Sequence, residues 1–173
     1  ARRLVFLSSV EIYGEQRGDA EKFDEEYMGY LNSNTMRAGY PESKRCGEAL
    51  CQAYIAEKGM DVVISRLPRV YGPTMLEADS KAAAQFIKKA VQGQDIVLKS
   101  EGNQHYSFLH VMDAVTGILT VMLQGKCKEA YNIADDRNDA TLRNLAELAS
   151  DIAGQKVVYE LPDAAERKGY SIA

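Results

Sequence analysis

Apolar residues along the chain fall into short runs separated by stretches with helical spacing, which predicts alternating strands and helices. Residues 4–8 and 62–67 are typical of buried parallel strands. Residues 41–58 predict a helix that ends at Gly59. Its apolar stripe comprises Ala49, Leu50, Ala53 and Tyr54. We interpret the polar stretch 15–38 as a long functional loop, so residues 4–67 predict a right-handed parallel crossover.

The second half of the chain predicts shorter elements. Residues 68–73, with two prolines, indicate a turn that no helix or strand continues through. Residues 96–99 and 105–110 predict a hairpin around a turn at 101–104. The remaining expected elements are helices at 80–91, 113–123 and 141–153 and strands at 130–134 and 157–161.

Composition bounds the class of protein. The 173 residues suffice for one sizeable core, and the net charge of −4 gives no electrostatic support to nucleic-acid binding. No apolar run approaches the ~20 residues that cross a bilayer, and no signal peptide is visible. Cys46, Cys51 and Cys127 show no metal-ligand spacing, which favours free thiols in a reducing compartment. These features predict a cytoplasmic protein without membrane or metal partners.

Two residues of the predicted helix form a candidate acid–base pair. Tyr40 and Lys44 are four positions apart, so they lie on one face of a helix, one turn from each other. An ammonium group at this distance favours the phenolate form of a tyrosine. Such a pair can exchange a proton with a hydroxyl or carbonyl oxygen while a hydride moves on its carbon. The spacing also arises by chance on many helices, as a tyrosine beside a solvated lysine.

Polar groups also follow the first predicted strand. Ser8, Ser9 and Glu11 lie just past its carboxyl end, before Gly14. Ligands of open α/β sheets bind at the carboxyl ends of the strands. We therefore expect Ser9 and Tyr40 to converge on one substrate oxygen.

Five segments, in order, carry a resemblance to a known family. They are LSSVEIYG (7–14), YPESK (40–44), RLPRVYGP (66–73), SFLHVMD (107–113) and YNIA (131–134). The chain resembles the extended short-chain dehydrogenase/reductases, the NAD-dependent sugar epimerases and dehydratases. The resemblance implies an α/β fold: the C-terminal part of a Rossmann-like, doubly wound parallel sheet plus a small α/β substrate-binding region. Residues 1–73 would belong to the NAD-binding domain and residues 74–173 to the substrate-binding region.

The same resemblance implies roles for individual residues. Tyr40 would be the catalytic acid/base, and Lys44 would bind the nicotinamide ribose and tune Tyr40. Ser9 would hydrogen-bond the reacting sugar oxygen. The backbone of Leu67 and Pro68 would run beside the nicotinamide ring and contribute to cofactor binding.

Glu11 bears on the type of reaction. It stands where dehydratases and decarboxylases of the family carry a glutamate that acts on the substrate carbons, whereas Val10 replaces a second acid of the dehydratases. Elimination of water uses two acids, so this pattern disfavours a 4,6-dehydratase. With Ser9, Glu11 resembles the arrangement of UDP-glucuronate decarboxylases, or of an epimerase with an incidental glutamate. Glu11 without a catalytic task is an equal alternative.

Two further positions concern the substrate. Tyr106 stands where many members carry an arginine for the substrate diphosphate, and tyrosine cannot provide a charged, bidentate contact. Arg69 stands where many members carry an asparagine, and it could restore some positive charge, or form a surface ion pair. A sugar or nucleotide sugar is the expected substrate, with Val10, Arg69 and Tyr106 in the substrate site.

The Gly-rich turn that binds the dinucleotide phosphates in this family is absent from the sequence. The expected cofactor is NAD, with NADP as an alternative. We interpret the chain as a fragment of such an enzyme and expect it to be inactive alone, without micromolar NAD binding. The resemblance also implies a homodimer through the Tyr40 helix, so we expect an exposed apolar face and self-association.

Other functions stay open on the residues alone. A simple NADP-dependent ketone or sugar reductase needs only Ser9, Tyr40 and Lys44. A non-catalytic, NAD-responsive binding module would need none of the three.

Overall fold

The computed structural model describes residues 2–135 and 137–161, which form two compact units. The first unit comprises Ala1–Val70 and Leu109–Ala134, and the second comprises Tyr71–Phe108 and Asp135–Ala173. The boundary after Val70 lies close to the division expected at residue 73, but residues 109–134 return to the first unit. They do so because strand β6 (Ala130–Asn132) pairs with β2 (Val62–Leu67).

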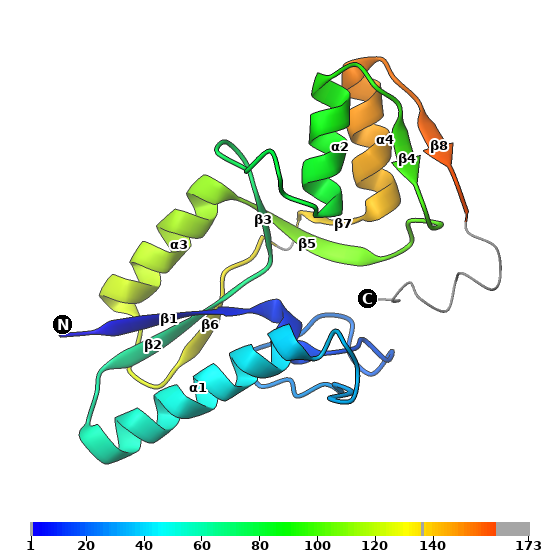
Figure 1. Cartoon of the computed structure of the whole chain (residues 1–173). Helices are drawn as coiled ribbons and strands as arrows, with labels where there is room; N and C mark the ends of the chain where they lie inside the picture. The colour runs from blue at the N-terminus through cyan, green and yellow to red at the C-terminus, as the bar shows by residue number, and fades with distance from the viewer. Residues whose placement is uncertain (1, 136, 162–173) are drawn as a thin grey trace. The chain divides into compact units, whose positions relative to one another are not determined.

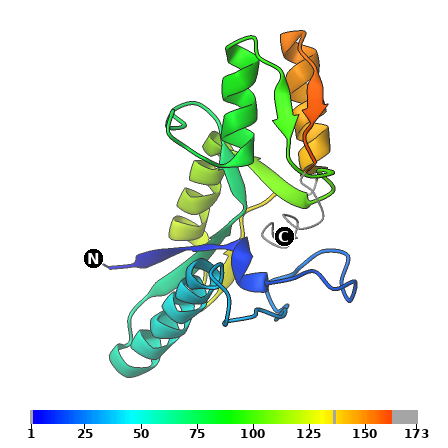
Figure 2. The same ribbon diagram turned by 45° about the vertical axis from the view of Figure 1, so that its right-hand side comes forward.

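The first unit is built on a parallel three-stranded sheet in the order β1-β2-β6 (Figure 1). Strand β1 (Leu4–Ser9) runs in register with β2 from Leu4↔Val62 to Ser9↔Leu67, which confirms the parallel pairing expected from the sequence. Helix α1 (Gly39–Lys58) connects the two strands and packs on β1. Helix α3 (Val111–Gln124) contacts β1 and β2. Both helices flank the sheet in the rotated view as well (Figure 2).

Helix α1 buries one face against the sheet. Cys51 and Ile55 pack with Val62 and Ile64 of β2, and Gly59 closes the helix in the left-handed conformation (φ 63°). The other apolar stripe of the helix stays exposed: 54% of Leu50 and 53% of Tyr54 are accessible. This face is the exposed apolar surface that the sequence predicts.

Close contact between α1 and β1 depends on a glycine. A Cβ at Gly47 would lie 2.3 Å from Cζ of Phe6. Since real Cβ atoms do not approach other atoms so closely, a side chain at this position would require the Phe6 ring to move.

Two short elements lie at the ends of the strands. The 3-10 helix η1 (Val10–Tyr13) follows β1 directly, and Ser9 is its N-cap. Strand β3 (Arg69–Tyr71) follows β2. The prediction that no strand continues through 68–73 was therefore wrong. Pro68 separates β2 from β3, and β3 ends just before Gly72 (φ 140°).

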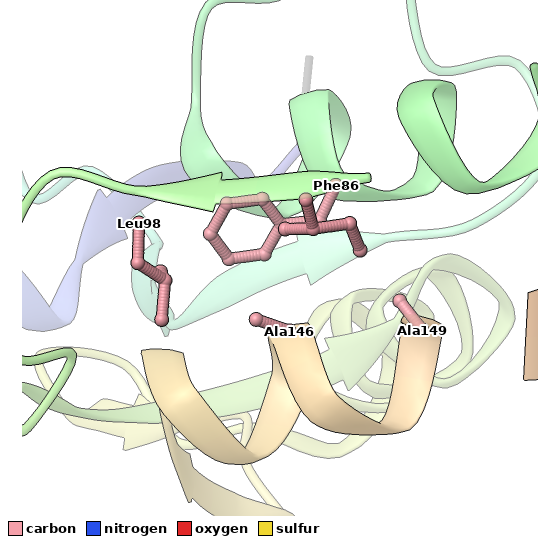
Figure 3. Packing of buried hydrophobic residues seen from close by; sticks show 5 residues of the cluster. Phe86, Leu98, Ala146 and Ala149 are labelled. Carbon is pink, nitrogen blue, oxygen red and sulfur yellow. The ribbon is translucent and has the colours of Figure 1, made fainter. Parts of the chain in front are cut away.

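The second unit packs two helices on a two-stranded parallel sheet. Helices α2 (Ala82–Val91) and α4 (Leu142–Ala153) contact each other, and β4 (Ile96–Leu98) pairs with β8 (Val157–Tyr159). The core of this unit comprises Phe86, Ile96, Leu98, Ala146 and Ala149 (Figure 3).

The predicted hairpin of 96–99 with 105–110 is wrong. Strand β5 (His105–His110) pairs antiparallel with β7 (Asp139–Thr141), a strand the sequence analysis missed. The connecting turn instead binds the start of α4, because the Gly102 carbonyl accepts the N–H of Arg143 at 3.0 Å. The turn therefore packs on α4 and does not join two paired strands.

The described residues 2–135 and 137–161 contain no helix that is both long and apolar enough to span a membrane.

Candidate active site

The carboxyl ends of β1 and β2 bring three predicted site residues to one edge of the sheet. Ser9 and Leu67 are register partners at the ends of these strands, and Pro68 follows. Ser9 is buried, and its Oγ accepts a hydrogen bond from the Glu11 N–H at 3.2 Å. The hydroxyl therefore starts η1 and keeps its own proton for another acceptor.

Tyr40 and Lys44 lie in the first turns of α1, beside the end of β1. The Lys44 ammonium donates a hydrogen bond to the Leu7 carbonyl at 2.9 Å. The same nitrogen is 5.6 Å from the ring centroids of both Tyr40 and Phe6. Since Tyr40 is 52% exposed, its phenol is open to a ligand. The pair predicted from the spacing thus shares one helix face, next to the strand that ends in Ser9.

The substrate residues predicted around Glu11 have different surroundings. Glu11 is exposed on η1, while Val10 beside it is half-buried. Arg69 is half-buried in β3. Tyr106 belongs to β5 of the second unit, where its ring meets the edge of Phe108 with the centroids 6.1 Å apart. Their roles toward a substrate stay predictions.

A buried hydrogen-bond network behind these residues was missed by sequence reasoning. Arg66 of β2 is 4% exposed. Its Nε and Nη2 donate to the two carboxylate oxygens of Glu48 on α1, at 3.0 and 2.7 Å. Its Nη1 donates to the Tyr13 hydroxyl at 2.9 Å and to the Glu25 carbonyl at 2.8 Å. One guanidinium thus joins β2, α1, η1 and the long loop.

The network continues to β6 through Tyr13. The Tyr13 hydroxyl donates to Oδ1 of Asn132 at 2.7 Å, and the Asn132 N–H donates to a carboxylate oxygen of Glu25 at 2.8 Å. Burial raises the pKa of the Tyr13 phenol, although hydrogen bonding to Arg66 opposes the rise. Burial alone would lower the pKa of the Arg66 guanidinium, but its bonds to Glu48 and Tyr13 outweigh burial and raise that pKa above its usual range. Both groups therefore keep one protonation state at neutral pH.

Tyr13, Arg66 and Asn132 each belong to a segment that carries the family resemblance. The sequence contains one signal for Glu48, the partner of Arg66. Glu48 continues the four-residue spacing of Tyr40 and Lys44, so it lies on the same helix face. Nothing in the spacing indicates that Arg66, 18 residues further along, meets that glutamate.

The long loop is held against the strand ends by the same region of α1. Arg45 donates to the carbonyls of Ile12 at 2.7 Å and Gly29 at 2.9 Å. The rings of Phe23 and Tyr27 stack at 4.2 Å, and both contact the ring of Tyr13. Apart from one isolated bridge, Glu15↔Tyr30, the stretch 15–38 contains no helix or strand, as the sequence predicts.

Within residues 2–135 and 137–161, no cluster of three or more histidine, cysteine or acidic side chains could hold a metal ion. All three cysteines are free thiols, and Cys51 is buried. Burial raises the pKa of the Cys51 thiol, and the nearby Glu48 adds to the rise.

Comparison with known proteins identifies related enzymes. UDP-glucuronic acid decarboxylase 1 of Xenopus tropicalis is 34% identical over 120 residues, which are 69% of this chain and 28% of that protein. UDP-glucuronic acid decarboxylase 3 of Arabidopsis thaliana is 30% identical over 165 residues, 93% of this chain and 47% of that protein. The chain therefore spans less than half the length of these relatives.

A solved structure supports the same fold. The dTDP-glucose 4,6-dehydratase of Bacillus anthracis, crystallised in complex with NAD, superposes with a TM-score of 0.79 at 26% identity. The superposition covers 92% of this chain and 50% of that one. The fold is thus part of a Rossmann-type α/β structure, as expected from the sequence.

The sequence model of one family, described as the NAD dependent epimerase/dehydratase family, matches residues 1–134. This match contains Ser9, Tyr40, Lys44 and the buried Arg66 network. The chain belongs to the NAD dependent epimerase/dehydratase family.

Proposed function

We propose that this chain carries the acid–base residues of an NAD-dependent cytoplasmic enzyme that acts on a nucleotide sugar. One observation carries the proposal: Tyr40 and Lys44 share a face of α1, and the Lys44 ammonium is bound at the end of β1, two residues before Ser9. Three hydrogen-bonding groups of the right kind therefore lie around the carboxyl edge of the sheet, where ligands bind in this fold.

The residues present fit the nicotinamide end of the cofactor. An ammonium group has three N–H donors, and the Leu7 carbonyl accepts one of those of Lys44. The others can donate to the hydroxyls of a ribose. Leu67 and Pro68 offer half-buried backbone beside them. When bound, NAD would accept a hydride from the sugar and return it within one cycle.

The side chains would then handle the protons. Tyr40 would exchange a proton with the sugar hydroxyl that becomes a carbonyl, and Ser9 would hydrogen-bond the same oxygen. Glu11 is exposed on η1, and it would act as a second base or orient the substrate. Arg69 would contribute positive charge toward the substrate phosphates, and Val10 would contact the sugar. A substrate contact of Tyr106, in the second unit, rests on the family resemblance alone.

Decarboxylation of UDP-glucuronate is the reaction we favour within this class. The similar proteins from Xenopus tropicalis and Arabidopsis thaliana are UDP-glucuronic acid decarboxylases. The chain has Glu11, but valine occupies position 10, where dehydratases carry a second acid. This pattern disfavours elimination of water. Oxidation of a hydroxyl next to the carboxylate-bearing carbon makes a ketone that lets CO2 leave.

Nicotinamide mononucleotide, the nicotinamide half of NAD, tests the proposed cofactor site. It suffices because the predicted contacts of Lys44, Leu67 and Pro68 all lie at the nicotinamide and its ribose. We expect nicotinamide mononucleotide and NAD to shift the same NMR resonances of the chain, those of Tyr40, Lys44 and Ser9, at millimolar concentration. AMP should leave them unchanged. Replacing Lys44 by methionine should weaken the binding about tenfold, because a charge-assisted hydrogen bond is lost.

The matched control is Lys58→Met, at the far end of the same helix. It should bind the mononucleotide like the wild type. Shifts confined to other parts of the chain, or equal responses to AMP, would refute the cofactor site. UDP-glucuronate and UDP-glucose can be compared in the same way, with a response of Glu11 to UDP-glucuronate expected.

We also propose that α1 mediates self-association through its exposed stripe. Leu50 and Tyr54 are each more than half exposed. Changing Leu50 to lysine should raise the dissociation constant of the dimer at least ~tenfold, since a leucine side chain contributes about 1.5–3 kcal/mol on burial. Light scattering over a concentration series measures this. Ala56→Lys, on the opposite side of the helix, should leave the dimer intact, and equal effects of both changes would contradict the assignment.

A further inference from the structure

The face of α1 that carries Tyr40 and Lys44 has a third member. Tyr40, Lys44 and Glu48 follow one another at four-residue steps, so they form one row along the helix. Lys44 is held by a single hydrogen bond in an exposed setting, where water competes for the same groups. Glu48, by contrast, makes two charge-assisted bonds to Arg66, and the side chains are 13% and 5% exposed. Glu48 is therefore the member of this row that charge-assisted bonds fix to the sheet, in addition to the packing of Cys51 and Ile55 on β2.

Arg66, the partner of Glu48, is itself held in place by its strand and its other hydrogen bonds. Its backbone lies in the middle strand of the sheet, paired with Ser8 on one side and Asn132 on the other. Its remaining guanidinium nitrogen is bound to Tyr13 and to the loop carbonyl of Glu25. The planar guanidinium cannot turn toward another partner without breaking these contacts. Whatever binds Arg66 bidentately is thus fixed relative to the ends of β1 and β2.

We propose that the buried Arg66–Glu48 pair is a positioning device that sets the rotation of α1 and so holds Tyr40 and Lys44 at the strand ends. The catalytic role of Tyr40 and Lys44 rests on the proposed function. Their positioning by Glu48 and Arg66 does not depend on it. Glu48 and Arg66 are positioning residues, because they act on the site only through Tyr40 and Lys44.

A second ion pair of the same unit serves as a matched control. Arg3 donates to the Asp61 carboxylate at 2.8 Å and to the carbonyls of Met122 and Gly125. This pair joins the start of β1 to the residue before β2, at the opposite end of the strands from Ser9. The variants Glu48→Gln and Asp61→Asn each remove one carboxylate charge with little change in volume.

The experiment reads the position of Lys44 directly, by NMR of the whole chain well below its unfolding temperature. The Lys44 ammonium lies over the Phe6 ring, so its ε-methylene protons should carry a ring-current shift and a nuclear Overhauser contact to Phe6. In Glu48→Gln we expect both signals to move toward those of a free lysine. In Asp61→Asn we expect both to stay. The double variant Glu48→Leu with Arg66→Met, which leaves no buried charge alone, should also lose them while remaining folded.

Retention of the Lys44–Phe6 contact in Glu48→Gln and in the double variant would overturn the proposal, as would an equal loss in Asp61→Asn. The affinity for nicotinamide mononucleotide separates this inference from the proposed function. If wild-type chain does not bind the mononucleotide but Glu48→Gln still releases Lys44, the positioning role stands and the cofactor role fails. If wild-type binds it, Glu48→Gln should bind several-fold more weakly, and an unchanged affinity would count against positioning.

Discussion

Replacing Arg66 by methionine will lower the free energy of unfolding of the chain by about 3–5 kcal/mol. The Glu48 side chain is only 13% exposed, and the change removes the guanidinium that binds both of its carboxylate oxygens. It also deprives the Tyr13 hydroxyl and the Glu25 carbonyl of a hydrogen-bond donor. A carboxylate held in such surroundings without compensation costs far more than an exposed ion pair contributes. Urea unfolding followed by circular dichroism measures the difference.

Two controls separate this effect from a general cost of losing an arginine. Arg3→Met breaks a pair that is 24% and 38% exposed, so it should lower the free energy of unfolding clearly less than Arg66→Met does. The double variant Arg66→Met with Glu48→Leu removes both charges and should recover much of the lost stability. If the single and double variants were equally unstable, lost packing rather than an unpaired charge would be the cause.

Replacing Gly14 by alanine will break the bridge between Glu15 and Tyr30 of the long loop and destabilise the chain. Gly14 has φ 75° and ψ −147°, a conformation that is almost confined to glycine and costs other residues about 1–3 kcal/mol. A Cβ there would also lie 2.1 Å from the carbonyl oxygen of Tyr30. Because that oxygen accepts the N–H of Glu15, the loop contact must break. Hydrogen exchange at the Glu15 amide and urea unfolding report the two effects.

Gly18 supplies a control with a positive φ but no clash. Its φ is 80°, but a Cβ there would meet nothing within 4 Å. Gly18→Ala should therefore show the strain alone, whereas Gly14→Ala should cost a further ~1–3 kcal/mol from the clash. Equal effects of the two substitutions, with the Glu15 amide still protected, would show that the loop does not depend on this close approach.

The order of elements could be predicted because it rests on local patterns. The apolar runs of β1 and β2, the helix that ends at Gly59, and the capped helix from Thr141 each follow from neighbouring residues. The candidate pair Tyr40 and Lys44 could also be predicted, since helical spacing alone places both on one face. The parallel pairing of β1 with β2 follows from the helix between them.

Strand partners in the second unit could not be predicted in this way. Residues 96–98 and 105–110 are close in sequence and separated by a glycine-containing turn, which is the usual signature of a hairpin. The outcome depended on which backbone groups the turn would bind. The Gly102 carbonyl accepts the N–H of Arg143 at the start of α4, while β4 pairs with β8 and β5 pairs with β7.

For this protein, the sequence by itself determined the α/β class, the family and the row of Tyr40 and Lys44 on their helix, because these depend on residues a few positions apart. Only the tertiary structure decided that Arg66 meets Glu48, Tyr13 and Glu25, since a buried guanidinium is satisfied by whatever acceptors folding brings to it from distant segments. The physical reason is the range of the interactions: helix and strand patterns are local, whereas a buried charge must find partners across the whole unit.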